Sequence, residues 1–287
     1  MNIKSISSHK NQEPESSVLY LVGTPIGNLN DISFRALNIL NNVSLIACED
    51  TRQTKKLMSK FEIKNYLISF NKHNSSKKIP KLIIDLKKGK SIALVSDAGM
   101  PSICDPGEEL VKEVKSNGLN IICIPGPCAA LSALVSSGLP SSKFIFEGFL
   151  PKKNTERKKT LIEISEHKKT TVLFESPHRI KKLLHELKDY CGGDREIEVS
   201  RELTKKFEEH IGNSIDEVIE FFRNKEVLGE FTLVIKGKNE SNNLEINLSS
   251  LKKDLKELTN AGLSLSAASK YLAKKTNIAK SIIYKLH

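Results

Sequence analysis

Residues 18–28 read VLYLVGTPIGN, an apolar run that passes directly into a loop containing glycine and proline. The pattern occurs twice more, as IALVSDAGMP at residues 92–101 and as IICIPGPCAA at residues 121–130. Short apolar runs bounded by glycine and proline are typical of buried parallel strands. The loops then lie at the carboxyl ends of the strands, where open α/β sheets bind ligands and glycine lets a ligand approach the backbone. The repeated pattern therefore predicts a small-molecule pocket.

The segment from residue 18 to residue 124 alternates strands with helices. Two more strands are expected at residues 43–47 and 66–70, and two helices are expected at residues 79–86 and 108–115. A further helix, before residue 43, is expected to begin with Asn30 or Asp31 as its N-cap. This order predicts a mainly parallel sheet with helices on both faces.

A second unit is expected to begin at the segment Pro125-Gly126-Pro127. It opens with a helix of small residues at 129–137. Four strands are expected after this helix, at residues 144–146, 171–174, 196–199 and 231–235. The spacing of the last three strands favours hairpins over strand–helix repeats, which indicates a mixed sheet. The predicted fold class is α/β, with a parallel-rich N-terminal sheet, a mixed C-terminal sheet and a small helical C-terminal extension.

The chain is therefore divided into four expected segments. They are a disordered tail at residues 1–17, an N-terminal α/β domain at 18–124, a C-terminal α/β domain at 125–238 and a helical extension at 248–287. A polar linker at 236–247 leads to the extension. Residues 264–286 resemble a helix-turn-helix, for which a nucleic-acid role and a purely packing role both stay open.

The chain carries a formal net charge of +11, from 45 basic and 34 acidic residues. This balance suits a polyanionic partner such as RNA or DNA, and it also suits a lysine-rich surface without one. Basic clusters such as residues 157–159 are expected on that surface. Lysine cannot replace the planar guanidinium of arginine, so the few arginines near motifs are expected to bind phosphate or carboxylate. These are Arg35, Arg52, Arg179 and Arg201.

The composition also indicates the cellular compartment in which the protein is expected. No apolar run is long enough to span a bilayer, and the polar first 17 residues lack the apolar core of a signal peptide. The five cysteines are odd in number and show no CxxC spacing, which favours reduced thiols over a disulfide framework or a zinc site. We therefore expect a cytoplasmic protein without a membrane partner or a bound metal.

Ionisable side chains follow the predicted strands. Residues 48–52 read CEDTR, which puts two carboxylates and a guanidinium at a strand end, with Asp50 or Glu49 as a candidate base. The alternative is a helix N-cap with a surface Asp–Arg pair. Asp97 could receive a ligand ammonium or hydroxyl group, or cap its own turn. The fingerprints GxGxxG and GxxxxGKS/T are absent, which argues against a standard dinucleotide site and a P-loop.

Two later blocks also combine charges. Residues 174–179 read FESPHR, in which Glu175, His178 and Arg179 converge on a strand end. Residues 201–209 read RELTKKFEE, which is either a solvated helix start or one wall of a cleft between domains. A lone histidine is more often structural than catalytic, so the roles of these groups stay open.

In this order, the blocks resemble the tetrapyrrole-methylase superfamily of S-adenosylmethionine-dependent enzymes, and within it the branch that methylates ribosomal RNA. The resemblance covers about residues 18–240 and is carried by LVGTPIGNL (21–29), EDTRQT (49–54), SDAGMP (96–101), PGP (125–127), FESPHR (174–179), RELTKKFEE (201–209) and GEF (229–231). It implies two α/β domains with S-adenosylmethionine between them, and a homodimer. The implied reaction is methyl transfer to the ribose 2′-hydroxyl of a cytidine in the decoding region of 16S rRNA, in the small ribosomal subunit.

The resemblance also implies roles for particular residues. The cofactor pocket would be lined by Pro25, Gly27, Asp97, Ala98, Gly99, Pro101, Ala129 and Ala130, with Leu150, Leu203 and Phe231 as its second-domain wall. The candidate catalytic residues are Asp50, His73 and Glu175 as bases, and Arg52 and Arg201 as groups that hold phosphate or orient a carboxylate. The chain departs from the family pattern at Ser75, where an acid is usual, and this weakens any role for an acid at that position.

Two rival functions remain. The first is a methylase of a small tetrapyrrole or of a protein side chain on the same fold, which the basic charge disfavours. The second is a non-enzymatic RNA-binding protein that uses the helical extension, which the three pocket loops disfavour.

Overall fold

The computed structural model describes residues 13–238, 251–276 and 278–286 of the chain. Their contacts divide the chain into two compact units. We call the first, which comprises Met1–Ser165 and Lys169–Lys236, the sheet unit, and the second, which comprises Glu166–Lys168 and Gly237–His287, the helical unit.

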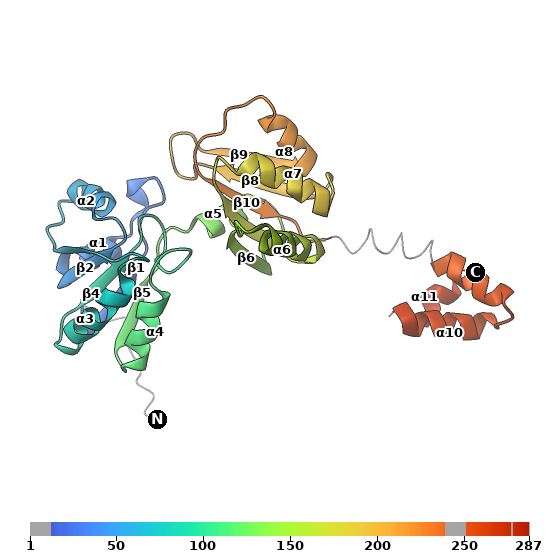
Figure 1. The fold of residues 1–287 in the computed structure, drawn as a ribbon, viewed down its shortest axis with the longest axis horizontal. Coiled ribbons are helices and arrows are strands. Elements are labelled where there is room, and N and C mark those ends of the chain that lie inside the picture. Colours follow the sequence, from blue (N-terminus) through green and yellow to red (C-terminus); the bar gives the residue numbers. More distant parts are fainter. Residues whose placement is uncertain (1–12, 239–250, 277, 287) are drawn as a thin grey trace. The chain divides into compact units, whose positions relative to one another are not determined.

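The first sheet of the sheet unit is entirely parallel, with strand order β3-β2-β4-β1-β5 (Figure 1). Its strands are β1 (Val18–Val22), β2 (Leu45–Cys48), β3 (Leu67–Ser69), β4 (Ile92–Val95) and β5 (Asn120–Ile124). Its helices are α1 (Phe34–Asn42), α2 (Thr51–Lys60), α3 (Ser75–Lys87) and α4 (Glu108–Ser116). This confirms the predicted parallel sheet.

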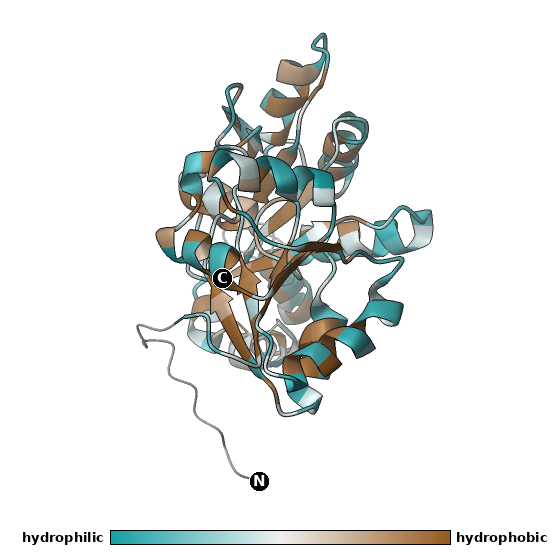
Figure 2. Ribbon diagram, turned by 90° about the vertical axis from the view of Figure 1, so that its left-hand side faces the viewer, coloured by the Kyte–Doolittle hydropathy of each residue, from teal (hydrophilic) through white to brown (hydrophobic). Residues whose placement is uncertain are grey.

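Both faces of this sheet are buried, because side chains alternate along each strand. On β1, Val18 and Tyr20 pack into a core with α1 and α2, whereas Leu19 packs into a second core with α3 and α4. The short strands are therefore continuously apolar, as parallel strands covered by helices on both faces must be. In Figure 2 the strands are drawn mainly in brown and the helices alternate brown with teal.

The second sheet is mixed, with strand order β6-β7-β10-β8-β9, and only its β6–β7 pair is parallel. Its strands are β6 (Phe144–Phe149), β7 (Thr170–Glu175), β8 (Glu196–Arg201), β9 (Glu209–Ser214) and β10 (Phe231–Ile235). Its helices are α5 (Ala129–Ser136), α6 (Asn154–Glu166), α7 (Ile180–Cys191) and α8 (Ile215–Phe222). One face packs against α6, α7 and α8, and the other packs against α5. The predicted mixed sheet is confirmed.

Two local features differ from the expectation. A helix start was one of the two alternatives for the block 201–209. Strand β9 begins at Glu209, at the end of this block. It is an edge strand in which Ile211 alone is buried, so it carries no apolar run that the sequence could reveal. The expected N-cap of α1 at Asn30 or Asp31 is wrong. Ser33 caps this helix by accepting the Ala36 N–H at 3.1 Å, because a short 3₁₀ turn precedes it.

Within its described residues, the helical unit contains three short helices: residues 251–260, α10 (Leu265–Thr276) and α11 (Lys280–Tyr284). Leu255, Leu272 and Ile283 belong to its small buried core. Gly262, with φ of +97°, makes the turn after the first helix, where a break was expected. Residues 1–12 of the tail expected at residues 1–17, and most of the linker, lie outside the described residues. In the described part of that tail, Glu13 pairs with Arg35 at 2.6 Å. Within the described part of the chain, no helix is long and apolar enough to cross a membrane.

Candidate functional site

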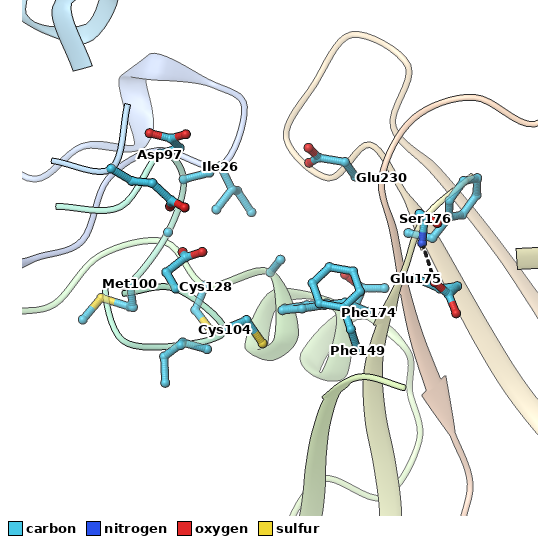
Figure 3. A pocket seen from close by; sticks show the side chains of 18 of the residues that line it. Ile26, Asp97, Met100, Cys104, Cys128, Phe149, Phe174, Glu175, Ser176 and Glu230 are labelled. Atoms are coloured by element: carbon cyan, nitrogen blue, oxygen red, sulfur yellow. Dashed lines mark hydrogen bonds between the residues drawn. The ribbon is translucent and has the colours of Figure 1, made fainter. Parts of the chain in front are cut away.

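A cavity of about 410 Å³ lies between the two sheets of the sheet unit, and we call it the first cavity. The loop after β4 supplies Asp97 and Met100 to one side of it, and the second sheet supplies Phe149, Phe174 and Glu175 to the other. Figure 3 shows these two groups of side chains facing each other. The rings of Phe149 and Phe174 have centroids 5.6 Å apart and form an aromatic wall.

The loops of the first sheet are locked together by their backbones. Thr24 and Gly99 exchange two backbone hydrogen bonds, of 2.9 and 3.0 Å, which join the loops after β1 and β4. A Cβ atom on Gly23 would lie 2.7 Å from the Cα atom of Gly126, closer than real side chains allow. The loops after β1 and β5 therefore touch main chain to main chain, and glycine is required at both positions.

Two further cavities adjoin the first. The second cavity, of about 500 Å³, is bordered by Glu49, Asp50, Thr51, Arg52, Ser69, Asn71, Lys72, His73 and Asp97. The third cavity, of about 560 Å³, is bordered by residues that include Pro25, Gly27, Gln53, Lys56, Lys205 and Glu230. Asp97 borders all three cavities, and Glu49 borders the first two. The loop after β4 is thus the point where an apolar cavity and two more polar ones meet.

Asp50 is both the N-cap of α2 and the partner of Arg52. Its carboxylate accepts the Arg52 backbone N–H at 2.8 Å and two guanidinium nitrogens at 2.6–3.1 Å. The hydrogen bonds from the Arg52 side chain and backbone lower the pKa of Asp50 to about 2. The Asp50 backbone N–H in turn donates to the Asp97 carboxylate at 2.9 Å. The cap and the Asp–Arg pair anticipated as one alternative are both present.

Glu175 lies at the wall of the first cavity with its side chain wholly buried. It stands 3.7 Å from the guanidinium of Arg157 and 3.4 Å from that of Arg179. Arg157 also donates twice to Glu186, at 2.8 and 2.6 Å, and Arg179 donates to the Leu150 carbonyl at 2.9 Å. Glu175 is therefore held in an internal network of charges that fixes the turn between β7 and α7.

Arg157 was expected on the surface as part of a basic cluster, and that expectation is wrong. Its side chain is 5% exposed, because two carboxylates from other elements surround it. The signal that could have revealed this role is the choice of arginine beside two lysines, since arginine is the residue suited to buried ion pairs. His178 is exposed, so of the three groups in its block only Glu175 and Arg179 come together.

The four arginines near motifs all contact carboxylates of the chain itself. The pairs are Arg35–Glu13, Arg52–Asp50, Arg179–Glu175 and Arg201–Glu209, at 2.6, 2.6, 3.4 and 2.7 Å. Arg201 also donates to the Leu228 carbonyl at 2.7 Å. Of the four, Arg52 borders one of the cavities described above, and its side chain is 86% exposed. It is therefore the one with a free face toward a ligand.

The remaining residues singled out in the sequence fall into three places. Asp97, Ala98, Gly99, Ala129 and Phe231 line the first cavity. Pro25 and Gly27 border the third cavity, and His73 borders the second with an exposed side chain. Pro101, Ala130, Leu150 and Leu203 are buried and are not among the lining residues of these cavities.

Two carboxyl groups of the first cavity have perturbed acidity. Burial raises the pKa of Asp105, and the nearby charge of Asp97 adds to that effect. Burial also raises the pKa of Glu49, with contributions from Asp105 and Asp97 and an opposing one from Lys72. Proline and glycine follow Asp105, a sequence typical of a turn, and this context gives no sign that Asp105 also lines the cavity. Among the residues that the structure describes, no cluster of His, Cys, Asp and Glu could hold a metal ion.

The side chains that line the first cavity suit one kind of ligand. Aromatic and aliphatic side chains supply a dry wall for a flat ring. Five acidic residues are among the lining residues of this cavity, and of these Glu49, Asp97 and Asp105 lie in the loops of the first sheet and favour a cationic group. An amphipathic molecule that carries an aromatic base and positive charge fits these features.

Comparisons with known proteins identify the family of the chain. A family model described as tetrapyrrole (corrin/porphyrin) methylases matches residues 18–219. The ribosomal RNA small subunit methyltransferase I of Bacillus subtilis (strain 168) is 42% identical over 281 residues, which cover 96% of this chain and 95% of the relative. The protein of the same name from Thermotoga maritima is 47% identical over 220 residues, which cover 77% of this chain and 98% of the relative.

Solved structures show the same fold at lower identity. The cobalamin biosynthetic enzyme cobalt precorrin-4 methyltransferase superposes with a TM-score of 0.59 at 18% identity, over 77% of this chain and 95% of that chain. Uroporphyrin-III-C-methyltransferase from Thermus thermophilus superposes with a TM-score of 0.53 at 17% identity, over 77% of this chain and 94% of that chain.

Proposed function

The chain belongs to the family of tetrapyrrole (corrin/porphyrin) methylases, and from this premise we propose that its methyl acceptor is the RNA of the small ribosomal subunit. S-adenosylmethionine is the methyl donor. The proposed acceptor atom is the ribose 2′-hydroxyl oxygen of a cytidine in the decoding region of 16S rRNA. The family match ends at residue 219, so the chemistry is assigned to the sheet unit.

The observation that carries this proposal is the meeting of three cavities at Asp97. The first cavity fits the donor, because Phe149 and Phe174 offer an aromatic wall to adenine and Asp97 offers a carboxylate to a cation. When bound, the donor supplies a methyl group on a positively charged sulfur, already activated toward a nucleophile. Much of the remaining work is then to position the acceptor.

The second and third cavities suit a nucleotide. Arg52, Lys72 and Lys56 border them with exposed side chains, which favours phosphate groups at their rims. The second cavity is lined by polar and charged side chains, as expected for a ribose with its hydroxyl groups. An unstacked nucleotide could enter such a site, whereas a paired base could not.

The helical unit adds positive charge to the chain. Residues 251–286 contain eight lysines against two acidic residues. Lys270, Lys274 and Tyr271 are exposed on α10. Lysines with an exposed aromatic ring suit a nucleic-acid surface, and this supports RNA over a small tetrapyrrole as the substrate.

A homodimer in the cytoplasm completes the proposal. Leu131 and Val135 of α5 expose 49% and 75% of their surfaces one turn apart on the helix. Apolar side chains gathered in this way favour a partner surface. Light scattering of the purified chain would report a dimer, and a monomer at micromolar concentration would contradict this part.

The function is tested by mapping ribose methylation on small-subunit rRNA from cells with and without the gene. A ribose 2′-O-methyl group protects the adjacent phosphodiester bond from alkali, so the wild-type strain should show one protected position that the deletion strain lacks. Purified protein with radiolabelled donor should restore the mark on subunits from the deletion strain. Transfer to a small tetrapyrrole with none to rRNA would refute the proposal.

A further inference from the structure

Glu49 stands at the passage between the first and the second cavity. It follows β2 directly, and among the lining residues of these two cavities it and Asp97 are the ones that both share. If the donor lies in the first cavity and the ribose in the second, the reacting atoms meet beside these two carboxylates. The inference below therefore rests on the proposed function.

The other candidate bases are engaged or are placed elsewhere. Both oxygens of Asp50 are bonded to Arg52, and a pKa of about 2 makes this carboxylate a poor proton acceptor. Asp97 already accepts the Asp50 N–H with one oxygen. Glu175 is buried between two guanidinium groups. His73 borders only the second of the three cavities.

The Glu49 carboxylate, in contrast, has no hydrogen-bond or ion-pair partner within the described part of the chain. It is half-buried, and the charged groups that act on it are Asp105, Asp97 and Asp50, which raise its pKa, and Lys72, which lowers it. The net effect is a raised pKa, with burial as the largest cause. A carboxylate in this state binds a proton more readily than an ordinary glutamate, which is what a general base needs.

We propose that Glu49 is the catalytic base that accepts the proton of the ribose hydroxyl. As the hydroxyl oxygen forms its bond to the methyl carbon, the carbon–sulfur bond breaks and its electron pair stays on sulfur. The hydroxyl proton passes to a Glu49 carboxylate oxygen and is later released to water. Asp50, the neighbouring carboxylate, positions Arg52 and the start of α2 and takes no proton.

The test compares the full-length wild-type protein with Glu49→Gln and Glu49→Asp. Single-turnover methyl transfer to small subunits from the deletion strain should fall at least about 100-fold in Glu49→Gln, which is the usual contribution of a general base. Affinity for S-adenosylmethionine, measured by thermal shift, should fall by less than about threefold, because Asp97 and Asp105 keep their carboxyl groups in the first cavity. The wild-type rate should rise with pH as Glu49 ionises, and Glu49→Gln should lose this step. Glu226→Gln, at an exposed position away from the cavities, is the matched control.

A second readout needs no catalysis. Because folding raises the pKa of Glu49, its neutral form is favoured in the folded state, so the contribution of Glu49 to wild-type stability declines as pH rises above about 4.5, the usual value for this group. Glutamine stays neutral. The thermal midpoint of Glu49→Gln should therefore rise relative to that of the wild type between pH 4.5 and 7, and that of Glu226→Gln should not.

The outcomes separate the two hypotheses. If the wild type methylates rRNA and Glu49→Gln keeps its rate within threefold with the same pH profile, Glu49 is not the base and the proposed function stands. A rate loss matched by an equal loss of donor affinity would also overturn the role, because Glu49 would then act only in binding. If the wild type transfers no methyl group to rRNA, the proposed function fails, and this role fails with it.

Discussion

Replacement of Arg157 by methionine should destabilise the sheet unit severely. The Arg157 guanidinium lies 3.7 Å from the Glu175 carboxylate and bonds twice to Glu186, and its side chain is 5% exposed. Methionine retains much of the unbranched side chain, so the main loss is of charge and not of packing. The substitution leaves the buried Glu175 carboxylate without one of its two cationic neighbours.

The size of the stability loss depends on the cationic partners that Glu175 and Glu186 keep after the substitution. Removal of one partner from a buried ion pair costs about 3–5 kcal/mol, because it leaves a buried charge uncompensated. Here Arg179 remains 3.4 Å from Glu175, and Glu186 retains Lys182 at 3.7 Å. The cost should therefore lie near the lower end, at about 3 kcal/mol, or roughly 6–12 °C in the melting temperature of a unit of this size.

Urea denaturation followed by circular dichroism measures this cost. Arg223→Met is the matched control, since the Arg223 side chain is 67% exposed and its pair with Glu220 is worth only about 0.5 kcal/mol. Adding Glu175→Gln to Arg157→Met should recover part of the loss, because the orphaned carboxylate is removed. Equal costs for Arg157→Met and Arg223→Met would refute the argument that the buried network stabilises this wall of the cavity.

Two further substitutions test the loops of the first sheet. Gly126→Ala would put a Cβ atom 2.8 Å from the backbone of Gly23, so it should cost about 1–3 kcal/mol and shrink the thermal shift induced by S-adenosylmethionine. Gly118→Ala puts its side chain into open space but at a φ of +68°, so it should lower stability and leave that shift unchanged. Asp50→Asn should lower the thermal midpoint at neutral pH. The pKa of Asp50 is depressed to about 2 in the folded state, so its contribution is present above about pH 4 and is lost as pH falls toward 2. A midpoint difference between Asp50→Asn and wild type that does not vary with pH would show that the pair with Arg52 contributes nothing.

The strands of the first sheet could be predicted because their signal is local. A strand such as β1 is buried on both faces, so its apolar run appears in the sequence without reference to any other segment. The loops after β1, β4 and β5 were equally visible, because their glycine and proline residues serve the backbone of the loop itself. The position of the site at the carboxyl end of the sheet follows from these two signals together.

Strand β9 had no such signal. It pairs with β8 alone at the edge of the second sheet and buries only Ile211, so its polar sequence is indistinguishable from that of a loop. The partners of Arg157 were hidden for a related reason, although the choice of arginine beside two lysines favoured a buried ion pair. The residues that surround it, Glu175 and Glu186, come from β7 and α7, and nothing in a basic cluster on α6 reveals that they converge.

The amino-acid sequence alone specified two α/β sheets and the loops that border the cavities, because propensity and burial pattern act within a few residues along the chain; the kind of ligand was implied by the family resemblance. The difference in acidity between two adjacent carboxyl groups, those of Glu49 and Asp50, was decided by the tertiary structure. Asp50 turns into its own helix and binds Arg52, whereas Glu49 meets Asp97 and Asp105 from the next loop of the sheet. Side-chain acidity depends on charge and solvent within a few ångströms, and those neighbours come from distant parts of the chain.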